Sequence, residues 1–105
     1  MNVVSGWYPV DDGATVGQTG SEKGVILDDE EHSLGARITL EKGGDIAPFS
    51  VTCGIYGLLV HTRFFSDEAD GKQAYEAMKL GLVAVADAGG ENANERASAF
   101  IAEFP

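Results

Sequence analysis

The densest group of reactive side chains in the 105-residue sequence is a run of four acids and a histidine: Asp28, Asp29, Glu30, Glu31 and His32. Carboxylates on a loop are the ligands that hard cations prefer, but calcium loops interleave them with small residues so that the side chains converge. Four consecutive acids on extended backbone point to alternate sides instead. Zinc would need further His or Cys ligands, and only Cys53 and His61 remain, both distant in sequence. We therefore expect no metal site here, and interpret the run as an exposed charged turn whose acids are replaceable with little loss of stability.

A second group is formed by Cys53, His61 and Arg63. If Cys53 and His61 faced each other across a hairpin, they would form a thiolate–imidazolium pair. Arg63 beside them would be placed to bind an anion or a carboxylate. A lone cysteine in a β-prone segment is, however, commonly a buried small hydrophobic residue. No third side chain that would orient the histidine is evident, so these residues are catalytic candidates only under an alternative interpretation.

Aromatic residues form the third group. Tyr56 and Phe64 are expected to share the sheet face opposite the helices. If that face is uncovered, self-association is one way to bury it, because most soluble oligomers are homo-oligomers and two-fold dimers are the commonest. The alternative is that the N-terminal segment folds over the face and that Trp7 plugs it.

The glycine-rich segment GQTGSEKG, residues 17–24, invites comparison with a phosphate-binding loop. A P-loop ends in Gly-Lys-Ser/Thr and leads directly into a helix. Here Lys23 follows Glu22, and the strand-like sequence GVIL comes next. The segment therefore does not fit a phosphate-loop motif, and no cofactor is predicted.

Alternating apolar and polar residues predict strands on both sides of the acidic run, from Gly24 and again through Ala36, Ile38 and Leu40. The β-prone stretch that follows is too long for one strand. We expect it to break near Gly54 or Gly57 into strands over 48–53 and 57–65, the alternative being one bent strand. Residues 1–23 read as a poorly defined arm and loop that adds at most a fifth strand.

The second half is predicted to be helical. The first helix starts between 67 and 71, capped by Ser66 or Asp70, and ends at Gly89–Gly90. Its core-facing stripe is predicted as Tyr75, Met78, Leu82 and Val85. A neighbouring stripe of small residues is predicted to lie against another element: Ala74, Ala77, Gly81, Ala84 and Ala88. The second helix is expected to be capped by Asn92 with Glu95 and to bury one face: Ala93, Ala97, Phe100, Ile101 and Phe104.

Strands followed by helices predict a single α+β domain over 1–105, in which an antiparallel sheet of four to five strands packs against two C-terminal helices in two layers. Residues 24–65 supply the main strands and 66–104 the helices. We see no internal repeat, no low-complexity tract and no linker.

The net charge of the chain argues against some classes of binding partner. Seventeen acids against seven bases give a net charge of −10, which disfavours binding to nucleic acid or to anionic membranes. No apolar run reaches the ~18 residues of a membrane span, and the N-terminus lacks the features of a secretory signal. A single cysteine excludes an internal disulfide. We expect a cytoplasmic protein.

The leading hypothesis is a small acidic interaction module without enzymatic activity. It would be dimeric through Tyr56 and Phe64, or would bind a basic protein in the manner of an inhibitor or immunity protein. The alternative is a small enzyme or ligand-binding domain with a pocket near Cys53, His61 and Arg63.

Overall fold

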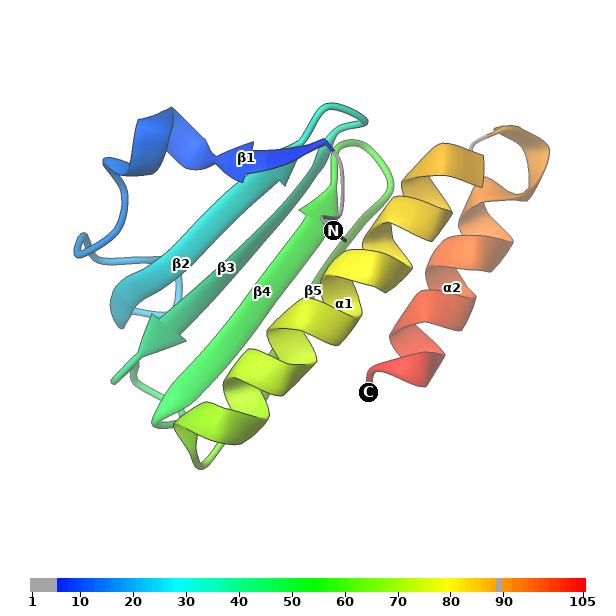
Figure 1. The fold of residues 1–105 in the computed structure, drawn as a ribbon. Coiled ribbons are helices and arrows are strands. Elements are labelled where there is room, and N and C mark those ends of the chain that lie inside the picture. Colours follow the sequence, from blue (N-terminus) through cyan, green and yellow to red (C-terminus); the bar gives the residue numbers. More distant parts are fainter. Residues whose placement is uncertain (1–5, 89) are drawn as a thin grey trace.

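A computed structural model describes residues 6–88 and 90–105. It shows a five-stranded antiparallel sheet and two helices, which confirms the predicted α+β class (Figure 1). The elements are β1 (Trp7–Pro9), β2 (Val25–His32), β3 (Ala36–Lys42), β4 (Phe49–Ile55), β5 (Leu59–Phe65), α1 (Glu68–Ala88) and α2 (Ala93–Glu103), with 3-10 turns at Val10–Gly13 and Gly90–Asn92. The strands lie in the sheet in their sequence order, so β1 and β5 are its edges.

Both helices lie on one face of the sheet, with α2 beyond α1 on the β5 side (Figure 1). Alternate residues of the central strands project toward them: Ala36, Ile38 and Leu40 from β3, and Val51, Cys53 and Ile55 from β4. The predicted stripe of α1 is buried against these residues: Tyr75, Met78, Leu82 and Val85. The core is therefore the single layer between sheet and helices.

The acidic run is not a turn, so that prediction is wrong. Strand β2 continues through His32, and the chain reverses over residues 33–35. Gly35 has φ +95°, a backbone conformation that residues other than glycine rarely adopt. A strand accommodates these acids because its side chains alternate between the two faces of the sheet, where Asp29 pairs with Arg37 and Glu30 with Lys79.

The long β-prone stretch forms the predicted hairpin, with strands at 49–55 and 59–65 in place of 48–53 and 57–65. Its turn contains Tyr56 and Gly57, and Gly57 has φ +76°. The N-terminal segment supplies the fifth strand, β1, which pairs with β2. Residues 1–5 of the expected arm lie outside the described part of the chain.

Trp7 does not plug the open face of the sheet, contrary to the second expectation for that face. Its ring lies on the helix side, 5.5 Å from Lys79 Nζ and packed against the core. Residues 10–24 approach the opposite face instead. They fold back on the start of β2, where Gly17 N donates to Ile26 O and Ile26 N donates to Gln18 O.

The cap of α1 is Asp67, whose Oδ1 accepts from Asp70 N at 2.9 Å. This differs from the predicted Ser66 or Asp70 cap, although the start lies within the expected range. Asn92 makes no side-chain capping bond to α2, so the predicted capping pair with Glu95 does not form. The predicted end of α1 at Gly89 lies outside the described residues.

The small-residue stripe of α1 is only partly buried. Ala74 is buried, and a side chain added at Gly81 would place its Cβ 2.9 Å from Phe100 Cε1 of α2. Ala77 and Ala84 are exposed, contrary to prediction. Ile101 on α2 is also exposed, whereas Ala97, Phe100 and Phe104 are buried as expected. Among residues 6–88 and 90–105, no helix has the length and apolarity needed to cross a membrane.

Candidate functional site

Cys53 and His61 are direct register partners on β4 and β5, which meets the condition under which the sequence would allow them to form a pair. Both lie on the helix side of the sheet. Cys53 is buried, and burial raises the pKa of its thiol to about 12. The thiolate is the nucleophilic form of cysteine. At neutral pH this thiol is protonated, and the environment does not activate it.

His61 and Arg63 hold the end of the chain that follows α2. His61 Nε2 hydrogen-bonds to the carbonyl oxygen of Phe104, and Arg63 Nε donates to that of Pro105 at 3.2 Å. The Arg63 guanidinium also lies 5.0 Å from the Phe65 ring centroid, a cation–π distance. The three catalytic candidates are thus brought together, and each has a packing or anchoring contact.

The acidic run sends its side chains to both faces of the sheet. On the open face, away from the helices, Asp29 Oδ1 accepts from Arg37 Nε at 2.9 Å, and Asp29 Oδ2 accepts from Arg37 Nη2 at 2.7 Å. Thr39 Oγ1 donates to Asp29 Oδ1 at 3.0 Å. Burial by itself would raise the pKa of Asp29, but these hydrogen bonds outweigh it and the pKa is lowered. Asp29 is only 3% exposed, so the expectation that these acids are exposed is wrong for it.

Glu30 points to the helix face and joins the sheet to α1. Its Oε1 accepts from Tyr75 Oη at 2.7 Å and from Lys79 Nζ at 2.8 Å. Burial, followed by the hydrogen bond to Glu30, raises the pKa of Tyr75. Glu30 is therefore a structural residue as well.

The remaining members of the run do not converge on a common point. The pKa of Asp28 is raised by burial and by the charge of Glu30. His32 Nδ1 accepts from Leu34 N at 3.0 Å, and its ring meets Trp7 edge-on with centroids 5.2 Å apart. Within residues 6–88 and 90–105, no group of three or more His, Cys, Asp or Glu side chains is arranged to hold a metal ion.

Backbone N–H groups of the glycine-rich loop donate hydrogen bonds to a carboxylate of the same chain, that of Glu41. Glu41 on β3 is buried on the open face, where its Oε1 accepts from Gly24 N at 3.0 Å and from Glu22 N at 3.1 Å. A Cβ at Gly20 would lie 2.4 Å from this carboxylate. The loop backbone therefore wraps around Glu41, and it covers Glu41 and Ile26 at the end of the open face where β2 begins.

On the part of the open face formed by β4, β5 and their turn, Ser50 is buried and the other outward residues are partly or largely exposed. We call this part the open half-face and define it by these partly or largely exposed residues: Thr52, Gly54, Tyr56, Val60, Thr62 and Phe64. Tyr56 is 95% exposed, Val60 79% and Phe64 42%. Between them the surface is polar but uncharged, with Thr52 Oγ1 and Thr62 Oγ1 3.1 Å apart.

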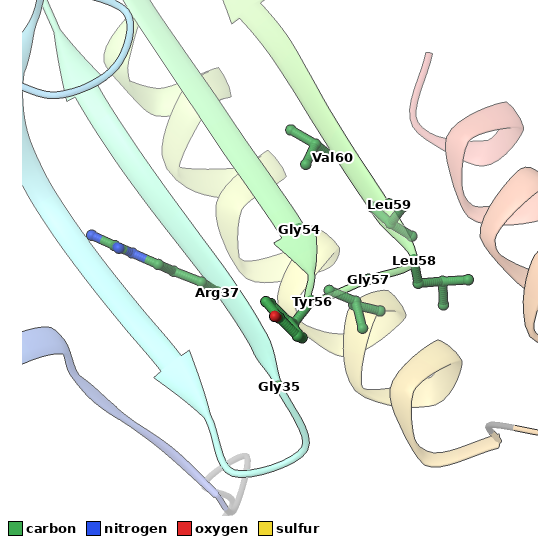
Figure 2. Close-up of a pocket in the computed structure, with 9 residues that line it drawn as sticks. Gly35, Arg37, Gly54, Tyr56, Gly57, Leu58, Leu59 and Val60 are labelled. Atoms are coloured by element: carbon green, nitrogen blue, oxygen red, sulfur yellow. The ribbon is translucent and has the colours of Figure 1, made fainter.

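An open depression of about 580 Å³, which we call the notch, lies at the turn end of this surface. Gly54 forms its floor because it pairs with Arg37 on one side and Val60 on the other, and so leaves a gap between their side chains (Figure 2). Tyr56 stands at the end of the gap (Figure 2). A second depression of about 430 Å³ continues from Arg37, Gly54 and Val60 to the edge of the covering loop.

Sequence reasoning identified Tyr56 and Phe64 but missed Val60, the Arg37–Asp29 pair and the notch at Gly54. One sequence signal was present: residues 46–66, which contain β4 and β5, include no Asp or Glu, although the chain has seventeen.

Comparison with known proteins adds no family, since no protein-family model, curated protein or solved structure matches this chain.

Proposed function

We propose that this protein is an interaction module that binds another protein through the open half-face. The observation that carries the proposal is the exposure of Val60 and Phe64 on one face of β5 together with Tyr56 in the adjoining turn. Single exposed apolar residues are ordinary on a protein surface, whereas several on one side of a hairpin favour a binding surface. Val60 and Phe64 are held by strand pairing to β4, and Tyr56 lies in the short turn that joins the two strands.

The surface is organised before any partner arrives. Seven register pairs join β4 to β5, and the bidentate pair with Asp29 holds Arg37 at the border of the notch. A partner therefore orders few side chains when it binds, which lowers the entropic cost of association. The notch at Gly54 is suited to an apolar side chain inserted beside Tyr56 and Val60.

A role without catalysis, and a cytoplasmic location, form part of this proposal. The buried, protonated thiol of Cys53 supports the first of these, because it offers no activated nucleophile. The net charge of −10 supports attraction of basic partners at long range. The open half-face itself carries no charged side chain, so contact there is not ionic.

The proposal is tested by replacing Tyr56 with a photoreactive benzophenone amino acid in the cells that naturally make the protein. The matched control places the same group at Leu80 on α1, a hydrophobic residue that is 60% exposed. We expect a discrete cross-linked partner from position 56 that position 80 does not give. We also expect the complex, rebuilt from purified components, to be lost with Val60→Asp. Equal products from both positions, or none from position 56, would contradict the proposal.

A further inference from the structure

The charge of the molecule is distributed unevenly. All seventeen acids lie outside residues 46–66, and Arg63, the only formally charged residue in that segment, projects to the helix side. On the side away from the helices, β4 and β5 carry the buried Ser50 and, within the open half-face, Thr52, Gly54, Val60, Thr62 and Phe64. None of them is charged. The open half-face is thus a neutral, partly apolar surface on a strongly acidic protein.

We infer that the partner bound by the open half-face is a second copy of this chain, packed half-face to half-face about a two-fold axis. This inference rests on the proposed function. At a two-fold axis a surface meets its own image, so residues near the axis approach identical residues. A charged group there would meet a like charge, whereas Val60, Thr62 and Phe64 meet neutral side chains. The surface that an acidic protein keeps free of charge is the one that a second acidic copy can approach.

A basic partner fits this surface less well. Its cations would lie over neutral side chains and would lose hydration without gaining an ion pair. The acids that would attract it lie outside the open half-face: Asp11 and Asp12 are exposed near the covering loop, and Asp67, Glu68 and Asp70 are at the start of α1. Charge complementarity therefore favours a neutral counterpart, and the chain itself provides one.

The two occupants predict opposite responses to salt. Two copies with a charge of −10 each repel one another, so screening strengthens their association. A basic partner is attracted by the same charge, so screening weakens its association.

The test is sedimentation equilibrium of the purified protein up to about 1 mM, a concentration at which even weak association is measurable. We expect a monomer–dimer equilibrium whose dissociation constant falls as salt is raised. Val60→Asp should raise that constant at least ~100-fold by placing like charges at the axis. Tyr56→Asp, which lies in the turn and leaves strand pairing intact, should act in the same direction. Leu80→Asp is the matched control and should leave the equilibrium unchanged.

A wild-type protein that stays monomeric throughout, or a dimer that Val60→Asp and Tyr56→Asp leave intact, would overturn the inference. A monomer whose position 56 still cross-links to a different protein overturns the second copy and leaves the proposed function standing. A monomer with no cross-link from position 56 contradicts both.

Discussion

Asp29 and Arg37 form a bidentate ion pair across β2 and β3 in which the two partners differ in burial. The Asp29 side chain is fully buried, whereas 55% of the Arg37 side chain is exposed. Since Asp29 faces Thr39 in the register, Arg37 reaches it diagonally and Thr39 donates from directly opposite. The pair ties Arg37, which borders the open half-face, to Asp29 on β2.

Neighbouring acids in this strand should respond to neutralisation with opposite outcomes. Asp29→Asn removes the acceptor of a charge-assisted pair and should lower the free energy of unfolding by ~1–3 kcal/mol. Asp28→Asn removes a charge that burial and Glu30 disfavour, so unfolding free energy should stay within ~0.5 kcal/mol of wild type or rise. Urea denaturation of the two variants measures both. Equal losses would show that the strand is not partitioned between its faces as described.

The same pair predicts a pH signature. The pKa of Asp29 in the folded state lies below its ordinary value of 3.8, so the folded state binds fewer protons than the unfolded state in this range. Its contribution to stability is complete above the unfolded-state pKa and is lost as pH falls through the folded-state pKa. Asp29→Asn should therefore have a shallower loss of stability below about pH 4. If the variant loses stability with falling pH as steeply as the wild type, carboxyl groups other than Asp29 are responsible for that loss.

Glu41 should control the covering loop. Glu41→Gln replaces one carboxylate oxygen by an amide donor that faces backbone N–H groups, and should cost ~1–3 kcal/mol of unfolding free energy. The amides of Glu22 and Gly24 donate to this carboxylate, so their hydrogen exchange should speed up selectively. The amides of Cys53 and His61 serve as an internal reference on the helix side of the hairpin. Unchanged exchange at Gly24 would show that the carboxylate does not hold the loop.

Packing between the two helices should be sensitive at Gly81. A Cβ there lies within 2.9–3.1 Å of Phe100 and Phe104 atoms. Gly81→Leu should destabilise by ~1–3 kcal/mol through overpacking, although leucine has the higher helix propensity. Ala77→Leu, at an exposed position of the same helix, should change stability by less than ~0.5 kcal/mol. Thermal or urea unfolding of both variants measures these changes. A Gly81→Leu protein that is more stable than the wild type would contradict the close packing of α2 against α1 at Gly81.

The thiol of Cys53 should be inert in the folded protein. With a pKa of about 12, roughly one thiol in ten thousand is ionised at pH 8. Alkylation by iodoacetamide should therefore be slow in buffer and should accelerate by several orders of magnitude in denaturant. Rapid alkylation of the native protein would revive the alternative of a reactive site built from Cys53, His61 and Arg63.

Periodicity predicted most of the fold because the core is a single apolar layer. Ile38 and Leu40 alternate with polar residues, and Tyr75 and Met78 recur at helical spacing, so each pattern has one interpretation. The hairpin of β4 and β5 followed from length alone, since a strand of eighteen residues is improbable.

The acidic strand could not be recognised in this way. Asp29 and Glu30 look like solvated turn residues until Arg37, Tyr75 and Lys79 are brought beside them, and those partners come from other elements. The open half-face was predictable in part, through Tyr56 and Phe64. Val60 became visible as a surface residue only when the register placed it beside Gly54.

The proposed function requires that the open half-face be covered when the protein functions. Hydroxyl-radical footprinting compares side-chain oxidation in dilute purified protein with that in the cells that make it. We expect oxidation of Tyr56, which is almost fully exposed in the isolated chain, to fall several-fold in the cells, while oxidation of Leu80 on α1 stays unchanged. Equal oxidation of Tyr56 in both settings, with Leu80 as the reference, would contradict the claim.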